Sequence, residues 1–339
     1  MAKLWSGRGP LVWLLWPASL VLRALVALRT SLYRHGCMRT HQLPVPVVVV
    51  GSVLVGGSGK TPVVLALVHH LLKQGHRVGV VARGYGRNTS DCREVTAEST
   101  SADSGDEPVL IKQATGVPVF VARRRADAAS SLLAHYPHTE VVICDDGLQH
   151  LSLRRNLEVC VFDDRGTGNG LLLPAGPLRE PWPRSVDLVL HTGALPAPAG
   201  HRATRRIAGY AKRGDGSQIE LAQLRGDGSK PLLAVAGIAR PMAFFDMLRA
   251  HGLTLSETIA FPDHYDFDSW SPKQYGSYEI LCTEKDAVKL WRRHPAALAV
   301  PLLLEPEPAF LHNFDRLLWN CPNDRPRWPL SSGHGHTTA

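Results

Sequence analysis

A lysine and a threonine at the end of a glycine-rich turn are the residues of this chain best suited to chemistry. The apolar segment Val47 to Val50 leads into a turn that ends in Gly59-Lys60-Thr61. In such a turn backbone N–H groups converge on phosphate oxygens, the lysine reaches the β and γ phosphates, and the threonine hydroxyl binds Mg²⁺. The pattern predicts a nucleotide phosphate site formed by Gly56, Gly57, Ser58, Gly59, Lys60, Thr61 and Pro62.

The turn is a variant of the common G-x-x-x-x-G-K-[ST] pattern. That pattern requires glycine where this chain has Leu54, and here Gly56 and Gly57 supply flexibility later in the turn. Pro62 suits the first turn of a helix, and apolar residues then recur at helical spacing as far as Gly75. The helix N-terminus would point at the bound anion. A chance Gly-Lys-Thr in a structural turn is the alternative, and the flanking strand and helix argue against it.

Two aspartate pairs that follow apolar segments are candidates for a metal site. Asp145-Asp146 follows one predicted strand, and Asp163-Asp164 follows another. Carboxylates at strand ends can bind the Mg²⁺ that accompanies a nucleotide. The first pair is favoured because further polar residues follow it. For either pair the alternative is that aspartate merely begins a turn.

Four other segments are richer in polar groups than surface loops require. Taken singly each suits a structural role, since Asp106 could cap a helix and His264 could be a surface residue. Together with the phosphate loop they supply the cations, carboxylates and base that phosphoryl transfer needs. The segments are Arg83 to Arg87, Gly105 to Pro108, Leu178 to Pro181, and Phe261 to Tyr265.

The elements that must position these groups are predicted by the apolar pattern. From Pro46 onward, short runs that are apolar at successive positions alternate with helical stretches. Such runs predict strands covered on both faces, and therefore a parallel sheet flanked by helices. Over 193–230 the composition changes to a mixture of Pro, Gly, Ala and Arg, which predicts that the domain junction lies there. We expect an α/β domain over 35–205, a smaller α/β domain over 206–325, and a disordered tail over 326–339.

Length and composition are those of a globular protein with anionic partners. The 339 residues suggest two domains, and the net charge is +8, carried mostly by arginine, which binds phosphates and carboxylates. The chain has no basic run interleaved with aromatic residues, so its sequence does not indicate nucleic acid binding. Nothing in the sequence indicates an obligate protein partner. The six cysteines lack the spacing of metal ligands, which indicates reduced residues in a cytosolic protein.

Residues 1–34 form a separate apolar region. The uncharged run over 9–22 has 14 residues, too few to span about 30 Å of hydrocarbon, and beyond Pro17 the pattern becomes amphipathic. Such a helix could lie in a membrane interface, with Trp13 and Trp16 at headgroup depth. A helix packed on the next domain is the alternative that the pattern leaves open. A secretory signal is disfavoured because arginines follow the apolar run.

Eight motifs, in order, resemble those of the tetraacyldisaccharide 4'-kinase family over about residues 44–290. They are Gly56 to Pro62, Arg83 to Arg87, Gly105 to Pro108, Asp145 to His150, Leu178 to Pro181, Gly237 to Ala239, Phe261 to His264, and Thr283 to Asp286. The resemblance implies transfer of the ATP γ-phosphate to the 4'-hydroxyl of a tetraacylated glucosamine disaccharide 1-phosphate, a late step of lipid A biosynthesis. It implies a peripheral enzyme at the cytoplasmic face of the inner membrane. It also implies a P-loop NTPase-like three-layer α/β/α domain and a smaller α/β/α domain, with the active site between them.

The resemblance also implies roles for individual residues. Asp106 paired with His264 would activate the sugar hydroxyl. Arg125 and Arg179 would neutralise phosphate charge, although Arg123 and Arg124 compete with Arg125 for its position. The expected metal ligands are Thr61, Asp145, Asp146 and Glu180. The expected catalytic residues are Lys60, Asp106, Arg125, Arg179, Glu180 and His264.

Three positions depart from the family pattern without affecting the reaction class. Ser52 and Leu54 replace an asparagine and a small hydroxyl residue, and Leu148 replaces a common phenylalanine. We expect these changes to tune nucleotide affinity. An acylated substrate and its anionic membrane surface also favour the interfacial position of the N-terminal helix.

Two other functions fit parts of the pattern. A GTPase or metallocentre chaperone can use a similar loop, but guanine recognition usually needs N/T-K-x-D, and Thr283-Glu-Lys-Asp286 has its lysine one position late. ATP is therefore favoured. A membrane-attached ATP-binding regulator is the second alternative, and it would not need the acids and His264.

Overall fold

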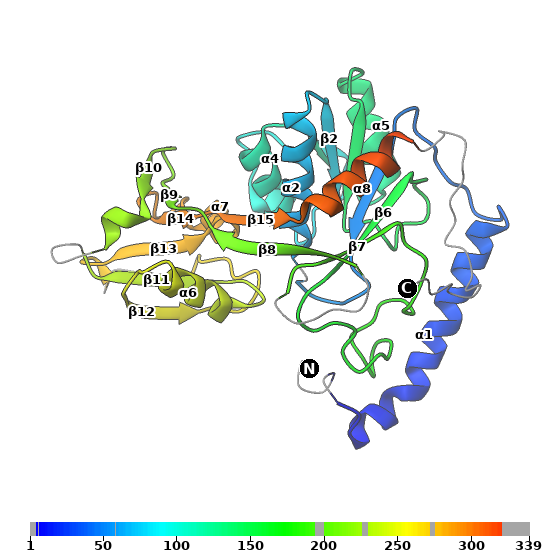
Figure 1. Cartoon of the computed structure of the whole chain (residues 1–339), viewed down its shortest axis with the longest axis horizontal. Helices are drawn as coiled ribbons and strands as arrows, with labels where there is room; N and C mark the ends of the chain where they lie inside the picture. Colours follow the sequence, from blue (N-terminus) through cyan, green and yellow to red (C-terminus); the bar gives the residue numbers. More distant parts are fainter. Residues whose placement is uncertain are drawn as a thin grey trace.

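Two β-sheets form the cores of two domains in the computed structural model, which describes residues 5, 7–57, 59–193, 200–225, 230–271 and 275–320 (Figure 1). The larger sheet has nine strands in the order β15-β8-β7-β6-β1-β5-β2-β4-β3. Its strands are β1 (Val47–Gly51), β2 (Val78–Ala82), β3 (Arg93–Glu94), β4 (Val119–Val121), β5 (Val141–Asp145), β6 (Leu157–Phe162), β7 (Leu188–His191), β8 (His201–Ile207) and β15 (Leu302–Pro306). The neighbours from β8 to β4 pair in parallel.

Alternate residues of the central strand β1 face two different cores. Val48 and Val50 join the core formed with α2 (Lys60–Lys73), α4 (Asp106–Thr115) and α8 (Pro308–Trp319). Val47 and Val49 join the core formed with α5 (Arg125–His135). Because both faces are covered, every residue of the strand is apolar or glycine, as the sequence predicted. The short helix α3 (Ser101–Ser104) precedes α4.

The smaller domain is also three-layered. Its sheet has the order β10-β9-β14-β13-β11-β12, with helix α6 (Pro241–Ala250) packed on one face and α7 (Glu284–Leu290) on the other. The predicted α/β/α class of both domains is confirmed. The strands are β9 (Tyr210–Lys212), β10 (Gln218–Glu220), β11 (Leu232–Ala236), β12 (Leu255–Ala260), β13 (Glu279–Thr283) and β14 (Leu298–Val300), with a 3₁₀ turn η1 (Leu221–Leu224).

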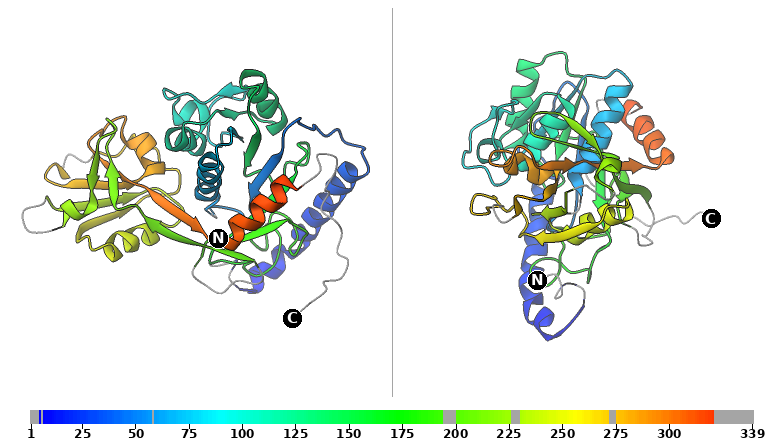
Figure 2. Two further views of the ribbon diagram at one scale, coloured as in Figure 1. Left: turned by 45° about the horizontal axis from the view of Figure 1, so that its top comes forward. Right: turned by 90° about the vertical axis from the view of Figure 1, so that its left-hand side faces the viewer.

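The chain crosses between the domains twice, along two paired strands. β8 leads into β9 of the smaller sheet, and β14 leads back into β15, which pairs antiparallel with β8 from Leu302–Ile207 to Pro306–Ala203 (Figure 1, Figure 2). Helix α8 then buries Phe310 and Phe314 in the core of the larger domain. Residues 302–319, expected in the smaller domain, thus pack with the larger one, because the chain returns to it through β15. The predicted tail, 326–339, lies outside the described residues.

Helix α1 (Pro10–Arg34) lies along the outside of the larger domain (Figure 1). Val12, Ser19 and Tyr33 are buried on one side of it. The Ser19 hydroxyl donates to the Leu172 carbonyl at 2.8 Å and accepts from the Ala175 amide at 3.1 Å. This side of the helix is anchored to the loop that follows β6.

The opposite side of α1 exposes large apolar side chains. Leu14 is 75% exposed, and Leu25 and Leu28 are each 58% exposed. Within the described residues, α1 is one helix whose length and composition would allow it to cross a membrane. The run over 9–22, judged too short to span, is thus part of a helix of 25 residues. Arg23 near its middle would make spanning costly by about 2.5–3.5 kcal/mol.

Candidate active site

The phosphate loop connects the buried strand β1 to helix α2. Gly59 caps α2 in the left-handed region, at φ 75°, and Lys60 and Thr61 begin the helix with buried side chains. Gly57 approaches the smaller domain so closely that an added Cβ would lie 2.9 Å from the Ala239 Cβ. The loop therefore lies at the domain interface. Ser58, predicted to bind phosphate, lies outside the described residues.

Asp146 is held between two cations beside this loop. The Lys60 Nζ lies 3.6 Å from its Oδ1, and Arg179 donates to both carboxylate oxygens at 3.1 and 3.2 Å. Arg179 also donates to the Leu54 carbonyl at 2.8 Å, which ties it to the loop. Burial raises the pKa of Asp146, but Lys60 and Arg179 outweigh it and hold that pKa below its usual value. Two predicted catalytic cations thus converge on one predicted metal ligand.

Asp145 offers a buried carboxylate oxygen suited to a cation. Its Oδ1 has no hydrogen-bond partner among the described residues. Burial, followed by the nearby Glu107 and Asp146 carboxylates, raises the pKa of Asp145 to about 7. A divalent cation would satisfy this oxygen and favour its ionised form. The chemistry of the residues present therefore fits Mg²⁺, and the Thr61 hydroxyl at the start of α2 could supply a second oxygen.

The other predicted metal ligands have protein partners. Asp146 pairs with cations, and Glu180 accepts from the Gln149 amide at 2.7 Å and lies 3.6 Å from the Arg184 guanidinium. Within the described ranges no group of three or more His, Cys, Asp or Glu side chains could hold a metal ion. A bound Mg²⁺ would take its remaining oxygens from nucleotide phosphates and water.

Glu180 belongs to a buried network of ion pairs that extends through Arg184 to Glu158 and Arg155. Arg184 also pairs with Glu158, whose other oxygen accepts from Arg155 at 2.9 Å. The Arg155 and Glu158 side chains are 7% and 8% exposed. Sequence reasoning missed this network, because nothing in the spacing shows that strand β6 lies beneath residue 180.

Removing the centre of this network should destabilise the fold. We expect Glu158→Ala to lower the free energy of unfolding by about 3 kcal/mol, because it leaves the buried Arg155 without a carboxylate and Arg184 with only its longer contact to Glu180. Urea denaturation measures the change. The control is Glu305→Ala, which removes the exposed pair with Arg206 and should cost less than about 1 kcal/mol. Equal losses from both variants would show that burial of the network is irrelevant.

Among three consecutive arginines, Arg125 is the buried one. It is 2% exposed, whereas Arg123 and Arg124 are exposed. Its guanidinium donates to the Asp146 carbonyl at 3.2 Å and reaches the Asp145 carbonyl at 3.5 Å. Asp146 has φ 47°, so Arg125 supports a left-handed turn that presents both aspartates. Its Nε and Nη1 atoms lack partners within the described chain.

Asp106 and His264 meet across the domain interface. Asp106 begins α4 directly after Gly105, and His264 lies in the loop after β12. The His264 Nδ1 lies 3.0 Å from Asp106 Oδ2, and the Lys289 Nζ lies 2.7 Å from the same oxygen. Burial raises the pKa of Asp106, but His264 and Lys289 outweigh it and keep the carboxyl ionised. The structure thus brings together the pair that the sequence analysis expected.

A cavity of about 540 Å³ opens between the domains. Lys60 and Thr61 line it from the larger domain, and Asp263 and Lys285 line it from the smaller one. Its remaining wall is largely apolar. Sequence reasoning missed several of its lining residues, which carry no local motif: Thr192, Arg202, Arg205, Arg240, Phe244 and Met247.

The competing aspartate pair also lies at the phosphate loop. Asp163 pairs with Arg165, which donates to the Val55 carbonyl at 3.0 Å. Asp164 pairs at 2.7 Å with Arg240 of the smaller domain. Each carboxylate therefore has an arginine partner and braces the loop or the domain interface. The sequence analysis did not single out Arg165. Its position directly after the aspartate pair could have suggested that it neutralises one of them.

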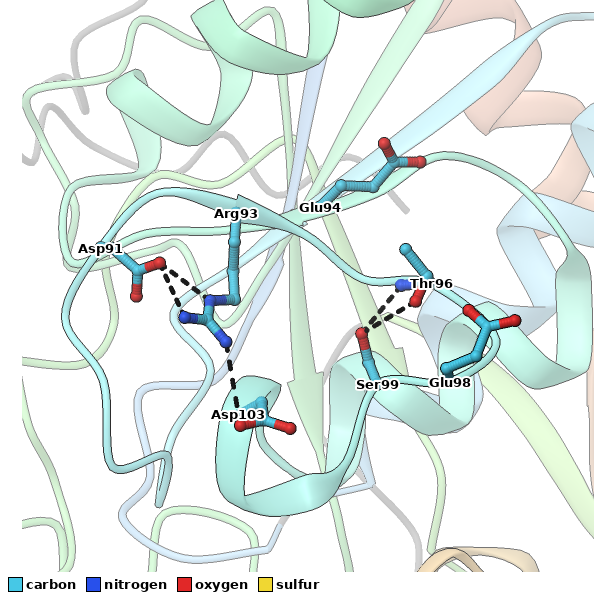
Figure 3. A pocket seen from close by; sticks show the side chains of 7 residues that line it. All are labelled: Asp91, Arg93, Glu94, Thr96, Glu98, Ser99 and Asp103. Atoms are coloured by element: carbon cyan, nitrogen blue, oxygen red, sulfur yellow. Dashed lines mark hydrogen bonds and ion pairs between the residues drawn. The ribbon is translucent and has the colours of Figure 1, made fainter.

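A second hollow lies at the edge strand β3 of the larger sheet (Figure 3). There Arg93 lies between Asp91 and Asp103, at 2.9 and 3.8 Å, and Thr96 bonds with Ser99. Two of the acidic side chains, Asp91 and Asp103, thus pair with a local cation. We assign no site to this hollow.

Fold and site together define a class of enzyme. A phosphate loop between a parallel strand and a helix, in a cavity that a second domain completes, is the arrangement of a P-loop phosphotransferase. A model of the family described as tetraacyldisaccharide-1-P 4'-kinase matches residues 11–319. The chain belongs to this family.

Similar proteins carry the same description. The tetraacyldisaccharide 4'-kinase of Acidovorax sp. (strain JS42) is 56% identical over 316 residues, covering 93% of each chain. That of Polaromonas sp. (strain JS666) is 52% identical over 345 residues, covering 99% of this chain and 100% of the relative. The crystal structure of LpxK from Aquifex aeolicus in complex with ATP superimposes with a TM-score of 0.76 at 28% identity, covering 89% of this chain and 96% of the other.

Proposed function

We propose that this chain transfers the γ-phosphate of ATP to the 4'-hydroxyl of a tetraacylated glucosamine disaccharide 1-phosphate. The observation that carries the proposal is that Lys60 and Asp263, the residue before His264, line one cavity. A phosphate held at the loop would therefore share this cavity with Asp263 and Lys285, whose side chains lie 3.9 and 3.4 Å from His264 Nε2. The family to which the chain belongs supplies the identity of the acceptor.

The cavity suits a nucleotide in both shape and chemistry. Its phosphate end has Lys60 and the start of α2, where backbone N–H groups favour anions. Its other walls include Phe244, Met247 and Val300, which suit the apolar faces of a base. The adenine would thus lie against the smaller domain. Bound ATP would therefore contact both domains.

Thr61 and Asp145 would hold Mg²⁺ beside the phosphates. The ion would supply positive charge to the γ-phosphoryl oxygens during transfer. Lys60 would contribute a further positive charge from the loop. Arg179, paired with Asp146, would hold that aspartate and the entrance of the loop in place.

The histidine is oriented to act as a base. Since its Nδ1 faces the ionised Asp106, the Nδ1 carries the proton and Nε2 is left as the acceptor. Nε2 lies 3.4 Å from the Lys285 Nζ, a contact that an incoming hydroxyl would replace. His264 would then take the hydroxyl proton while Asp106 stabilises the resulting imidazolium.

A transfer assay tests the proposal. Purified protein, γ-labelled ATP, Mg²⁺ and the disaccharide lipid in detergent should give a labelled lipid that carries the new phosphate at position 4'. Mass spectrometry and ³¹P NMR identify the position. Absence of labelled lipid would refute the kinase function. A preference for GTP over ATP would instead favour the alternative of a GTPase or metallocentre chaperone.

We also propose that α1 holds the enzyme peripherally at the cytoplasmic face of the inner membrane. The exposed apolar side of the helix supports an interfacial position, where it would meet an acylated substrate. Its arginines would attract anionic lipid by about 1 kcal/mol each. The Ser19 side of the helix would remain on the protein.

Charges on the exposed side of α1 should release the protein from membranes. We expect Leu25→Glu or Leu28→Glu to lower partitioning onto phosphatidylglycerol-containing vesicles at least about tenfold, because inserting one leucine contributes about 1.5–3 kcal/mol. Vesicle sedimentation measures this, with nucleotide binding retained. The control is Met242→Glu on α6, a residue 55% exposed outside α1. Unchanged sedimentation of the α1 variants would mean that this face does not contact lipid.

A further inference from the structure

We propose that Lys289 is a positioning residue that fixes His264 against Asp106 and so locks the smaller domain onto the reacting centre. The inference rests on the proposed function and extends it to a residue outside the motifs identified in the sequence. Lys289 lies in the last turn of α7, with its side chain 13% exposed.

The Lys289 ammonium has three acceptors, one for each of its N–H groups. Its Nζ lies 2.7 Å from Asp106 Oδ2, and it donates to the His264 carbonyl at 3.1 Å and the Tyr265 carbonyl at 3.2 Å. A lysine ammonium has three donors. All three are therefore used, one on the larger domain and two on the loop of the smaller domain. The lysine joins the two halves of the pair directly.

The contacts act on a residue whose backbone needs support. His264 has φ 64°, in the left-handed region, where a residue other than glycine is strained and persists only when its surroundings hold it. Its amide donates to the Gly237 carbonyl at 3.1 Å, and Lys289 binds its carbonyl. The two peptide groups that flank the strained residue are thus both held.

Lys289 contacts the pair at Asp106 Oδ2, the oxygen that faces His264 Nδ1, whereas Lys285 contacts His264 Nε2. Lys285, one turn earlier on α7, lines the cavity, and Asp106, His264 and Lys289 are not among the described residues that line it. Lys289 faces the Asp106 oxygen that also accepts from Nδ1. It can therefore influence the reaction only through the pair, by orienting it and by keeping the Asp106 carboxyl ionised. Loss of Lys289 should lower the rate of transfer and leave nucleotide affinity intact.

Substitution by an uncharged side chain of similar length tests this. We expect Lys289→Met to lower kcat about 10²-fold, since misplacing a reacting group by about 1 Å can cost that much, while KM for ATP stays within about threefold. The matched control is Lys112→Met on α4. Lys112 also donates to two carbonyls, of Gly116 and Val117, but has no carboxylate partner in the described chain. It should keep the wild-type kcat.

A double-mutant cycle separates positioning from a general loss of structure. In an Asp106→Asn background we expect Lys289→Met to cost less than about threefold, because the group it orients is already disabled. Losses that multiply, a wild-type kcat for Lys289→Met, or a loss confined to ATP affinity would each overturn the inference. If Lys289→Met shows no cooperative unfolding, Lys289→Arg takes its place, since a planar guanidinium cannot meet three divergent acceptors, and the same outcomes apply. A wild-type enzyme without lipid phosphorylation would refute the proposed function instead.

Discussion

Lys60→Ala is expected to lower kcat at least about 10²-fold while the protein stays folded. The Lys60 Nζ is the cation that α2 presents at the phosphate end of the cavity, and deleting one charge-stabilising donor typically costs this much. The fold should survive because Arg179 still pairs with Asp146 through two hydrogen bonds. Steady-state kinetics and thermal unfolding measure the two effects.

The control for this variant lies on the same helix. Lys73→Ala removes an exposed lysine from the last turn of α2, away from the loop, and should leave kcat unchanged. If Lys60→Ala retained nearly normal turnover, Lys60 would not contact the transferred phosphate. A loss of folding together with activity would show a structural role for its contact with Asp146.

Asp106→Asn and His264→Gln are each expected to lower kcat by about 10²- to 10⁴-fold, the usual contribution of a positioned base. The double variant should be no slower than the slower single variant by more than about threefold, because two groups that act as a unit are lost together. Their 3.0 Å contact across the domain interface is the physical reason. Single-turnover kinetics measure the chemical step.

The control for the pair is Asp246→Asn on α6, an exposed aspartate that pairs with Arg249 and should leave kcat unchanged. A double variant that showed the product of the two single losses would mean that Asp106 and His264 act independently. The base would then have to be assigned to one of them alone.

Much of the fold follows from local patterns. Runs such as Val47 to Val50 are apolar at every position because both faces of the sheet are covered, and this pattern is visible in the sequence. β8 is different, because it has exposed and partly exposed arginines along it and gave no strand signal. Its partner β15 follows Pro301 and returns to the larger sheet, a topology that no local pattern encodes.

Part of the site could likewise be predicted from local sequence patterns, and part of it could not. Lys60 and Thr61 begin α2 after the loop that follows β1, and Asp145 ends the neighbouring parallel strand β5. The order of strands and loops therefore predicts that all three lie at one edge of the sheet. Contacts such as Lys289 with Asp106 join residues from two domains and depend on how these domains meet. The family resemblance implied that Glu180 is a metal ligand, and in the structure its carboxylate contacts Arg184 and Gln149, which the sequence did not predict.

The most direct test of the account is a structure of the full chain with a non-hydrolysable ATP analogue and the disaccharide acceptor. We predict that the triphosphate lies against the loop at Lys60, and that the 4'-hydroxyl lies between its terminal phosphate and His264 Nε2. A nucleotide bound elsewhere, with the space beside Lys60 and Thr61 empty, would contradict the account.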